Sequence, residues 1–584
     1  MTYKFNEVII YLKNKNDLYI GMDKGSDALL RIYVADRRDT LQDIASKIRI
    51  PVEKLLELNP ELIDPGIEIG GHCVRIPLPA ADVSAALDLP DCSSTEPVSY
   101  MDNWIPHIPV EKMAEKEYDV LIVGSGAGGG AVLWRLCEQW GFSGKRVGLV
   151  EAGGLMLPTH YWNIPTLGSA TSGDYFLNPK ISNPIGQMLP DLPSAREVIA
   201  LGGKTLFWGT VSPRVLPSLM KKEWPVTPEE MEPYYNLAEE VMNVSKGYTE
   251  ESTIQQILLE RLRFKGFANV TGLPFAIDLQ PTRFGEIHSS PAFSSILFLA
   301  KAMNLGAFDL AIHARAVQVL TDGAKAAGVK VMTPDGKSFI IRAKTVVLSA
   351  NVYQTPRLLL NSGIPGRAIG HYLSHHTFLS TTIRLDTSAF PEISGVLGIL
   401  IPQSEDRPYQ IQIHGPGGDV WYNWYQQFQI KPSQTEWKIS LLGFGQMESR
   451  YENHVFLDPS DKDIYGVPTI KARLTYSPRD LEVIRRMEAG MRQASIASQP
   501  NWFGSNGQPD ICRVLPGADY HEFGTSRMGD DPLTSAANRY GQIHAISGLY
   551  VADNSVLPPI GGANPTLTTV ALAIRTADYI RSRE

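Results

Sequence analysis

Two short segments near the end of the chain contain side chains that could perform acid–base chemistry. The first is Tyr520–Gly529, which includes His521, and the second is Gly561–Thr566, which includes Asn564. Histidine titrates near neutral pH, so His521 is a candidate general base of the kind that removes a proton from a hydroxyl group. A buried histidine with a purely structural role is the alternative for an isolated residue of this type.

Asn564 has a structural interpretation as well as a chemical one. It directly precedes Pro565, and apolar residues such as Leu567 and Val570 then recur on one helical face. This pattern predicts a helix that is capped by Asn564 and has proline at its first position. A helix N-terminus at this place would also favour negative charge on a bound group. Capping and catalysis do not exclude each other.

A glycine-rich turn much earlier in the chain predicts a dinucleotide site. The apolar strand Tyr118–Val123 runs into this turn, a helix follows, and the next strand, Val147–Val150, ends at an acid. Glycines let the backbone approach a pyrophosphate, a helix N-terminus favours its negative charge, and the acid hydrogen-bonds a ribose. We therefore expect cofactor contacts from Gly124, Gly126, Ala127, Gly128, Gly129 and Glu151.

Strand patterns return twice later in the chain, which favours FAD over NAD. A hairpin pattern covers Ala316–Leu320, Gly328–Met332 and Ser338–Ile341, and a buried strand, Thr345–Ala350, follows it. Another strand, Leu549–Asp553, appears near the C-terminus. An NAD-binding domain normally ends within one domain's length. The interleaving predicts an α/β fold (α+β overall), with a Rossmann-like FAD-binding domain and an interleaved antiparallel-sheet substrate domain.

Residues 117–582 resemble the glucose-methanol-choline (GMC) oxidoreductase family, in its pyranose oxidase and glycoside 3-oxidase branch. The resemblance is carried by the glycine-rich turn with Glu151, by Gly202–Gly209, Val346–Gly363 and Tyr451–Pro459, and by the two C-terminal segments. It implies an FAD enzyme that oxidises a secondary hydroxyl of a sugar or glycoside, with His521 as base and Asn564 bound to the substrate oxygen. It also implies cofactor contacts at Gly203, Thr205, Trp208, Gly209, Val317, Asp553, Asn564, Pro565 and Thr566.

The resemblance also bears on how the flavin is held and reoxidised. Pyranose oxidases often bond the flavin covalently to a histidine, and Phe207 aligns with that position here. Non-covalent FAD is therefore implied. Molecular oxygen, giving hydrogen peroxide, is the expected electron acceptor, and a dehydrogenase that uses a quinone or protein acceptor is the alternative. A few relatives are lyases that hold FAD without net redox chemistry.

Residues 31–78 resemble a LysM module. Ile32–Val34 is typical of a short strand, Thr40 is placed to cap a helix, a second helix ends at Asn59, and Cys73–Pro77 is a last strand. The resemblance implies a small βααβ fold, whose members often bind N-acetylglucosamine polymers. A role in assembly or as a lid is the other interpretation. A glycan-binding protein with a secondary flavin domain is thus an alternative function for the chain.

The length of 584 residues predicts two or three domains. We expect an N-terminal extension in residues 1–30, the LysM-like module in 31–78, and a linker or arm in 79–116. Residues 117–375 and 510–584 are assigned to the FAD-binding domain. Residues 376–509 are assigned mainly to the substrate-binding domain.

Charge and cysteine content exclude several other classes of function. The chain has 54 basic and 62 acidic residues, so its net charge of −8 offers no field for nucleic acid or an anionic membrane. The four cysteines lie far apart, which argues against disulfides or zinc and suits a reducing compartment. Without a signal peptide or membrane span, the chain is expected to be cytoplasmic. No metal site is predicted, and a homo-oligomer is compatible with the sequence.

Further candidates carry weaker signals. The aromatic run Val420–Tyr425 could stack on sugar faces or pack within a strand. His375 and His376 could lie close to the flavin, although a structural role is favoured. His414 and His454 are interpreted as structural.

Overall fold

The computed structural model divides into two compact units, residues 1–98 and 99–584. Within the parts of the chain that it describes, no helix is long and apolar enough to cross a membrane. The structure describes residues 3–5, 8–14, 17–22, 30–77, 104–141, 143–164, 167, 169–185, 189–279, 292–386, 396–417, 436–498 and 508–583.

The first unit contains an antiparallel sheet in the order β1-β2-β3-β4-β5 and two helices. Thr40 begins α1 with a capping box, because its hydroxyl accepts from Asp43 N and its own N–H donates to Asp43 Oδ2. The βααβ order expected for residues 31–78 is confirmed. Residues 3–22 add three strands to which the sequence analysis assigned no element. The elements are β1 Tyr3–Phe5, β2 Val8–Asn14, β3 Asp17–Met22, β4 Leu30–Val34, α1 Leu41–Ile48, α2 Val52–Leu58 and β5 Cys73–Pro77.

The second unit is built on a seven-stranded mixed sheet, in the order β13-β7-β6-β16-β15-β14, with β24 also paired to β16. The strands next to β6 run parallel to it, as expected for a Rossmann-like domain, and β7 and the Thr345–Leu348 part of β16 are buried throughout. The strands are β6 Glu117–Val123, β7 Val147–Val150, β13 Phe308–Ala311, β14 Arg315–Asp322, β15 Lys325–Met332, β16 Ser338–Leu348 and β24 Leu549–Val551.

One boundary in this sheet differs from the expected one. Ser338–Ile341 and Thr345–Ala350 were expected to be two strands, but a single strand, β16, covers most of both. It pairs antiparallel with β15 up to Arg342 and parallel with β6 from Arg342 onward. The change of partner, rather than a turn, separates the two halves.

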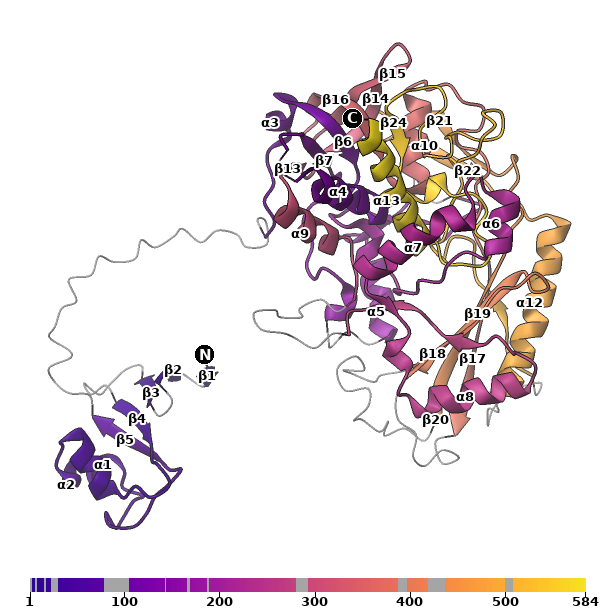
Figure 1. Cartoon of the computed structure of the whole chain (residues 1–584). Helices are drawn as coiled ribbons and strands as arrows, with labels where there is room; N and C mark the ends of the chain where they lie inside the picture. Colours follow the sequence, from indigo (N-terminus) through magenta and orange to yellow (C-terminus); the bar gives the residue numbers. More distant parts are fainter. Residues whose placement is uncertain are drawn as a thin grey trace. The chain divides into compact units, whose positions relative to one another are not determined.

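Helices cover this sheet. Figure 1 shows α4 between α9 and α13, with α7 beside α13. The apolar side of α4 packs on α9, where the rings of Trp134 and Phe298 stack at 5.6 Å, and Cys137 is buried in the same core. The helices are α4 Ala127–Trp140, α7 Pro228–Val241, α9 Ile296–Leu305, α10 Asn351–Asn361 and α13 Thr566–Arg583.

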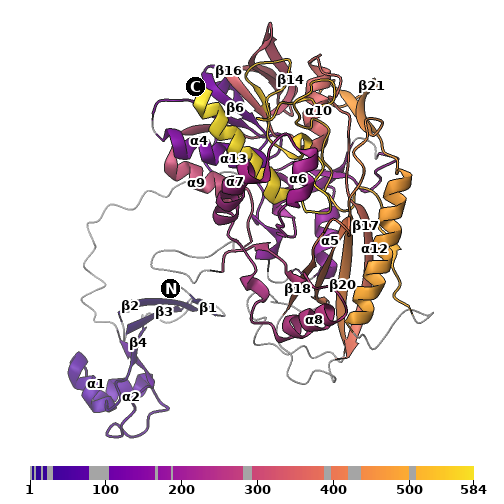
Figure 2. The ribbon, with the colours of Figure 1, turned by 45° about the vertical axis from the view of Figure 1, so that its right-hand side comes forward.

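A six-stranded antiparallel sheet, in the order β11-β18-β19-β20-β17-β23, forms the second layer. Figure 2 shows α12 lying along it, with α8 near its end. Ile411, Ile413 and Leu441 are fully buried in the core beneath these helices. The elements are α8 Thr253–Phe264, β11 Thr271–Gly272, β17 Thr377–Asp386, β18 Leu397–Ile401, β19 Tyr409–Gly417, β20 Glu436–Gly445, α12 Pro478–Ala497 and β23 Cys512–Arg513.

The fold class expected from the sequence is therefore confirmed, while the domain limits remain a prediction. The antiparallel sheet takes most of its strands from residues 376–509 but adds β11 and β23 from outside them. The shorter elements are α3 Val110–Ala114, η2 Tyr161–Asn163, α5 Ser169–Leu177, β8 Ser182–Pro184, β9 Arg196–Val198, η3 Gly203–Leu206, α6 Pro217–Glu223, β10 Val244–Ser245, η4 Gly247–Thr249, β12 Phe275–Ala276, β21 His454–Lys462, β22 Pro468–Arg473 and η6 Asn554–Val556.

Candidate active site

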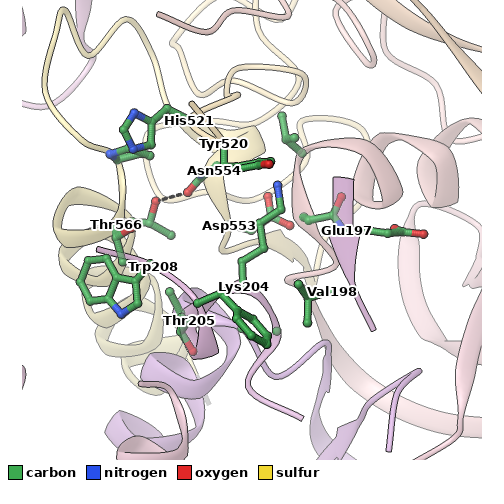
Figure 3. A pocket seen from close by; sticks show the side chains of 18 of the residues that line it. Glu197, Val198, Lys204, Thr205, Trp208, Tyr520, His521, Asp553, Asn554 and Thr566 are labelled. Carbon is green, nitrogen blue, oxygen red and sulfur yellow. Dashed lines mark hydrogen bonds between the residues drawn. The ribbon is translucent and has the colours of Figure 1, made fainter. Parts of the chain in front are cut away.

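A cavity of about 820 Å³ extends from the β6–α4 turn to strand β19. Figure 3 shows side chains from several elements around it, among them Lys204, His521 and Asp553. The residues expected to bind the cofactor or to act in catalysis line this cavity, with the exception of Gly129. They are Gly124, Gly126, Ala127, Gly128, Glu151, Gly203, Thr205, Trp208, Gly209, Val317, His521, Asp553, Asn564, Pro565 and Thr566.

The glycines of the β6–α4 turn have different tasks. A Cβ on Gly128 would lie 1.6 Å from Ala552 O, and one on Gly129 would lie 1.9 Å from Gly124 O, so both positions hold backbone against backbone. Gly126 differs, because no atom lies within 4 Å of where its Cβ would be. This glycine lines the cavity and leaves room for a bulky group at the N-terminus of α4. The turn therefore fits a dinucleotide pyrophosphate, and Gly129 supports it from behind.

Glu151 and Ser125 fix the geometry beside this turn. Glu151 accepts from Ser125 N at 3.0 Å, from Ser125 Oγ at 2.6 Å and from Gly153 N at 2.8 Å. Burial raises the pKa of the Glu151 carboxyl, and these bonds partly offset the rise. Ser125 also accepts from Gly202 N at 2.9 Å. Ser125 was not among the expected site residues, although its hydroxyl between two glycines was a visible signal.

The segment Gly203–Gly209 is held by its own polar side chains. Thr205 Oγ1 donates to Gly202 O at 2.6 Å and accepts from Ser295 N at 2.9 Å. Trp208 Nε1 donates to Phe293 O at 2.7 Å. These bonds direct the hydroxyl and the indole nitrogen toward protein partners, so the segment is held in a fixed conformation along the cavity wall.

His521 lies at a turn in the C-terminal segment. Tyr520, directly before it, has a φ of +55°, which turns the chain sharply. His521 Nε2 lies 3.3 Å from Asn564 Nδ2, and its Nδ1 lies 3.1 Å from His376 Nδ1. Burial lowers the pKa of His521 to about 4, so its imidazole is neutral at physiological pH.

His376 is buried and lies beside His521, and the structural role favoured for it stays a prediction. Asp519 Oδ2 accepts from the backbone N–H of His376 at 3.0 Å, and Asp519 Oδ1 lies 3.6 Å from His375 Nδ1. His375 Nε2 is 3.1 Å from the hydroxyl of Tyr476. Burial lowers the pKa of His376 to about 3. Burial of Asp519 would raise its pKa, but the contacts with the histidines hold it below its ordinary value.

No metal site was expected, yet the fold brings three possible metal ligands together. Ligand atoms of His376, Asp519 and His521 lie within 4.8 Å of one another. We interpret the group as a hydrogen-bonded network, because the two histidines face each other through Nδ1 at 3.1 Å. The carboxylate of Asp519 is already bonded to the backbone of His376.

The side chain of Asn564 does not cap the following helix. Its Oδ1 accepts from Gln410 Nε2 at 3.0 Å and from Gln412 Nε2 at 2.7 Å, so tertiary contacts replace the expected local bond. His414 Nε2 lies 3.2 Å from Gln412 Oε1, and His414 lines the cavity together with Gln412. Sequence reasoning missed both glutamines, because the polar residues that alternate along a strand usually face solvent.

Other candidates lie apart from this network. His454 is outside the cavity, and its ring stacks on His371 at 5.0 Å. The aromatic run Val420–Tyr425 is outside the described residues. Phe207 lines the cavity beside Phe176, with ring centroids 5.3 Å apart, and its phenyl ring has no atom that could form a covalent bond to a flavin.

The chain is similar to known protein families and to individual proteins. Models of the GMC oxidoreductase family match residues 196–378 and 449–573, and the LysM domain model matches residues 33–71. The chain is 27% identical to 2-methyl-1,2-propanediol dehydrogenase of Mycolicibacterium austroafricanum over 543 residues, covering 80% of this chain and 95% of that protein.

Two sugar oxidases are also similar. C-glycoside 3-oxidase of Microbacterium trichothecenolyticum is 31% identical over 288 residues, which cover 47% of this chain and about half (54%) of that protein. Pyranose 2-oxidase of Tricholoma matsutake is 23% identical over 451 residues, covering 68% of this chain and 76% of that protein. Formate oxidase of Aspergillus oryzae shares the fold, with a TM-score of 0.56, 16% identity, and coverage of 80% of this chain and 99% of that one.

The glycine-rich turn, the room beside Gly126 and the buried acid at the end of β7 fit FAD, which members of this family bind. Phe207 in place of a histidine is consistent with a flavin that is held without a covalent bond. The chain therefore belongs to the GMC oxidoreductases, FAD-dependent enzymes that act on CH–OH groups, and it carries a LysM domain in its N-terminal unit.

Proposed function

We propose that the protein oxidises a secondary hydroxyl of a sugar or glycoside, in the manner of a pyranose 2- or 3-oxidase. The observation that carries the proposal is the 3.3 Å contact between His521 Nε2 and Asn564 Nδ2, in a cavity that the dinucleotide turn also lines. A general base and a hydrogen-bond donor at one point suit the removal of a proton from an alcohol. Similarity to C-glycoside 3-oxidases and pyranose 2-oxidase favours a carbohydrate substrate.

In this proposal His521 is the catalytic base. Its lowered pKa keeps the imidazole neutral at neutral pH, so one ring nitrogen can accept the hydroxyl proton. Asn564 donates through Nδ2 to the substrate oxygen and so directs the hydroxyl toward His521. FAD, when bound, supplies the acceptor for the hydrogen that leaves the carbon as a hydride. The buried carboxylate of Asp519 stabilises the positive charge that His521 acquires.

The same proposal assigns the cofactor contacts. The β6–α4 turn and Glu151 would hold the pyrophosphate and a ribose, and Gly203–Gly209 with Pro565 and Thr566 would line the flavin side. Rings of Tyr161, Phe176 and Phe207 line the cavity and offer apolar faces for a sugar, which supports a carbohydrate substrate.

We propose molecular oxygen as the final acceptor. Oxidation of the alcohol to a carbonyl releases two electrons and two protons, and their transfer to oxygen yields hydrogen peroxide. A dehydrogenase with a quinone or protein acceptor is the second candidate, because 2-methyl-1,2-propanediol dehydrogenase is similar over 95% of its length.

Anaerobic reduction of the flavin, followed by admission of air, tests both parts. Pyranoses, O-glycosides, C-glycosides and simple diols are mixed in turn with the yellow holoenzyme. We expect a pyranose or glycoside to bleach the flavin, and air to restore the colour with formation of peroxide. Bleaching by diols alone would reject the carbohydrate proposal. Recovery only with a quinone would identify a dehydrogenase. Bleaching by a sugar would exclude a lyase that holds FAD without net redox chemistry, and no bleaching by any of these compounds would reject the proposed function.

A glycan-binding role for the first unit is a separate candidate. The LysM match covers residues 33–71, and two large apolar side chains there, Ile63 and Ile67, are exposed. Sedimentation of the full chain with insoluble chitin or peptidoglycan tests it. A chain that stays in the supernatant would reject glycan binding and leave an assembly or lid role for the module.

A further inference from the structure

Strand β19 places two kinds of side chain on its two faces. Ile411 and Ile413 are fully buried in the core covered by α8 and α12, whereas Gln410 and Gln412 lie on the other face. Successive side chains of a strand point to opposite faces, so His414 belongs to the face of the glutamines. The result is a polar stripe in a buried setting, next to Asn564.

Both glutamines donate to one atom of Asn564. Gln410 Nε2 lies 3.0 Å and Gln412 Nε2 lies 2.7 Å from Asn564 Oδ1. A carbonyl oxygen has two lone pairs, so these two bonds use all of its acceptor capacity. The Nδ2 group of Asn564 must therefore point the other way, and it lies 3.3 Å from His521 Nε2.

This orientation determines the tautomer of His521. An amide NH₂ group donates and does not accept, so His521 Nε2 must be the acceptor and carry no proton. The single proton of the neutral ring is then on Nδ1, and it is donated to His376 Nδ1 at 3.1 Å. His521 thus presents an unprotonated nitrogen beside Asn564.

His414 adds one more hydrogen bond to this series. Because Gln412 uses its Nε2 as a donor to Asn564, its Oε1 is free to accept from His414 Nε2 at 3.2 Å. In the series of hydrogen bonds from His414 to His376, the donor is therefore always the residue nearer to His414. Turning one amide over would place donor against donor or leave a buried polar atom without a partner, which is costly.

We propose that Gln410 and Gln412 are positioning residues that lock the amide of Asn564 and so keep His521 in the tautomer with a free Nε2. The inference rests on the proposed function, in which His521 is the base. Without the two donors, Asn564 can turn its oxygen toward His521. The imidazole then holds its proton on Nε2 and is unable to accept another there.

A double-mutant cycle tests this coupling. The limiting rate of anaerobic flavin reduction is measured for Gln412→Leu, Asn564→Ala and the double variant, with a sugar that bleaches the wild-type flavin. We expect Gln412→Leu to slow reduction about 100-fold, as misorientation of a catalytic group does. It should have little further effect once Asn564 is alanine, because the two residues act as one unit. An equal loss in both backgrounds would overturn the inference.

A second measurement observes the tautomer directly and does not depend on turnover. Histidine labelled with ¹⁵N is incorporated into the resting holoenzyme, and the His521 signals are assigned by their loss in His521→Gln. We expect a protonated Nδ1 and an unprotonated Nε2. In the isosteric Gln412→Glu variant, the carboxylate takes the Asn564 NH₂ group in a charge-assisted bond, so the tautomer should reverse. A protonated Nε2 in the wild type, or an unchanged tautomer in the variant, would contradict the proposal.

Controls separate this inference from the proposed function. Gln493→Leu removes an exposed glutamine on α12 that bonds to Lys265 O, and it should reduce at the wild-type rate with the same flavin content. Normal reduction in His521→Ala would reject the base itself. Slow reduction in His521→Ala combined with additive losses in the cycle would reject only the role of the glutamines.

Discussion

Asp519 and His376 are joined by a hydrogen bond of 3.0 Å from the backbone N–H of His376 to the carboxylate of Asp519. Asp519 is only two residues before His521, whereas His376 directly precedes strand β17. The bond therefore fixes the proposed base against the antiparallel sheet. It also places a buried negative charge close to the imidazole that becomes positive in the proposed mechanism.

Replacing this charge should impair the reaction while preserving the shape of the site. In Asp519→Asn, the imidazolium of His521 loses a stabilising charge, and we expect flavin reduction to slow by about 100-fold. The Asp519 charge raises the pKa of His521, which burial lowers, so the acid limb of the rate–pH profile should move to lower pH in the variant. Stopped-flow reduction measured over a range of pH checks both effects. Asp458→Asn, at a partly exposed acid on β21, is the matched control, and equal profiles for the two variants would reject the role of Asp519.

Two glycines of the same turn should respond differently to alanine. Gly126→Ala meets no protein atom within 4 Å, so the apoprotein should unfold at the wild-type urea concentration while its FAD content falls. Gly128→Ala would place a methyl group 1.6 Å from Ala552 O. We therefore expect the free energy of unfolding of this variant to fall by about 1–3 kcal/mol, through overpacking. FAD content and urea midpoints of the two variants distinguish these outcomes. An unchanged FAD content in Gly126→Ala would show that the room beside Gly126 does not serve a ligand.

His160 provides a test of how burial links stability to pH. The side chain is buried, its Nδ1 accepts from Trp162 N at 3.1 Å, and burial lowers its pKa from 6.5 to about 3. Between these values the unfolded chain takes up a proton that the folded protein excludes, so this residue reduces stability as pH falls below 6.5. At pH 7.5, His160→Gln should be less stable than the wild type by about 1–3 kcal/mol, through the lost bonds.

At pH 5 the difference in free energy of unfolding between the two proteins should narrow by about 2 kcal/mol. Only the unfolded wild-type chain takes up a proton at this position, and this uptake lowers its stability. Urea unfolding of both proteins at the two pH values measures the change. A constant difference would mean that the folded protein admits a proton at His160.

Deletion of residues 1–98 should leave the oxidation site intact. The residues that line the cavity all lie between Val123 and Thr569, within the second unit. We expect the shortened chain to bind FAD and to be reduced by sugar at the rate of the full chain. A large change in the apparent affinity for the sugar would instead favour the lid role of the LysM module.

Local patterns were sufficient to predict the cofactor turn. Strand, glycines, helix and acid follow one another directly between Tyr118 and Glu151, so the sequence alone places them together. The boundary within β16 was missed because a strand that exchanges one partner for another has no local signal. The expected cap at Asn564 was wrong for a related reason, since two glutamines far away in sequence bind its oxygen instead.

Contacts between distant segments explain why the other features of the site could not be predicted from the sequence. His376 and His521 are 145 residues apart, and nothing near either one indicates the other. Gln410 and Gln412 alternate with isoleucines, which is the ordinary pattern of a strand with one face in solvent. Only the position of β19 beside the C-terminal segment shows that this polar face is buried.

The most direct test of the account is anaerobic flavin reduction in His521→Ala. The variant should fold, bind FAD and remain yellow, but its limiting rate of reduction by a productive sugar should fall about 1,000-fold, as expected for loss of a general base. His454→Ala, a histidine outside the cavity, should be reduced at the wild-type rate. Reduction of His521→Ala at the wild-type rate would contradict the assignment of His521 as the base and, with it, the proposed mechanism.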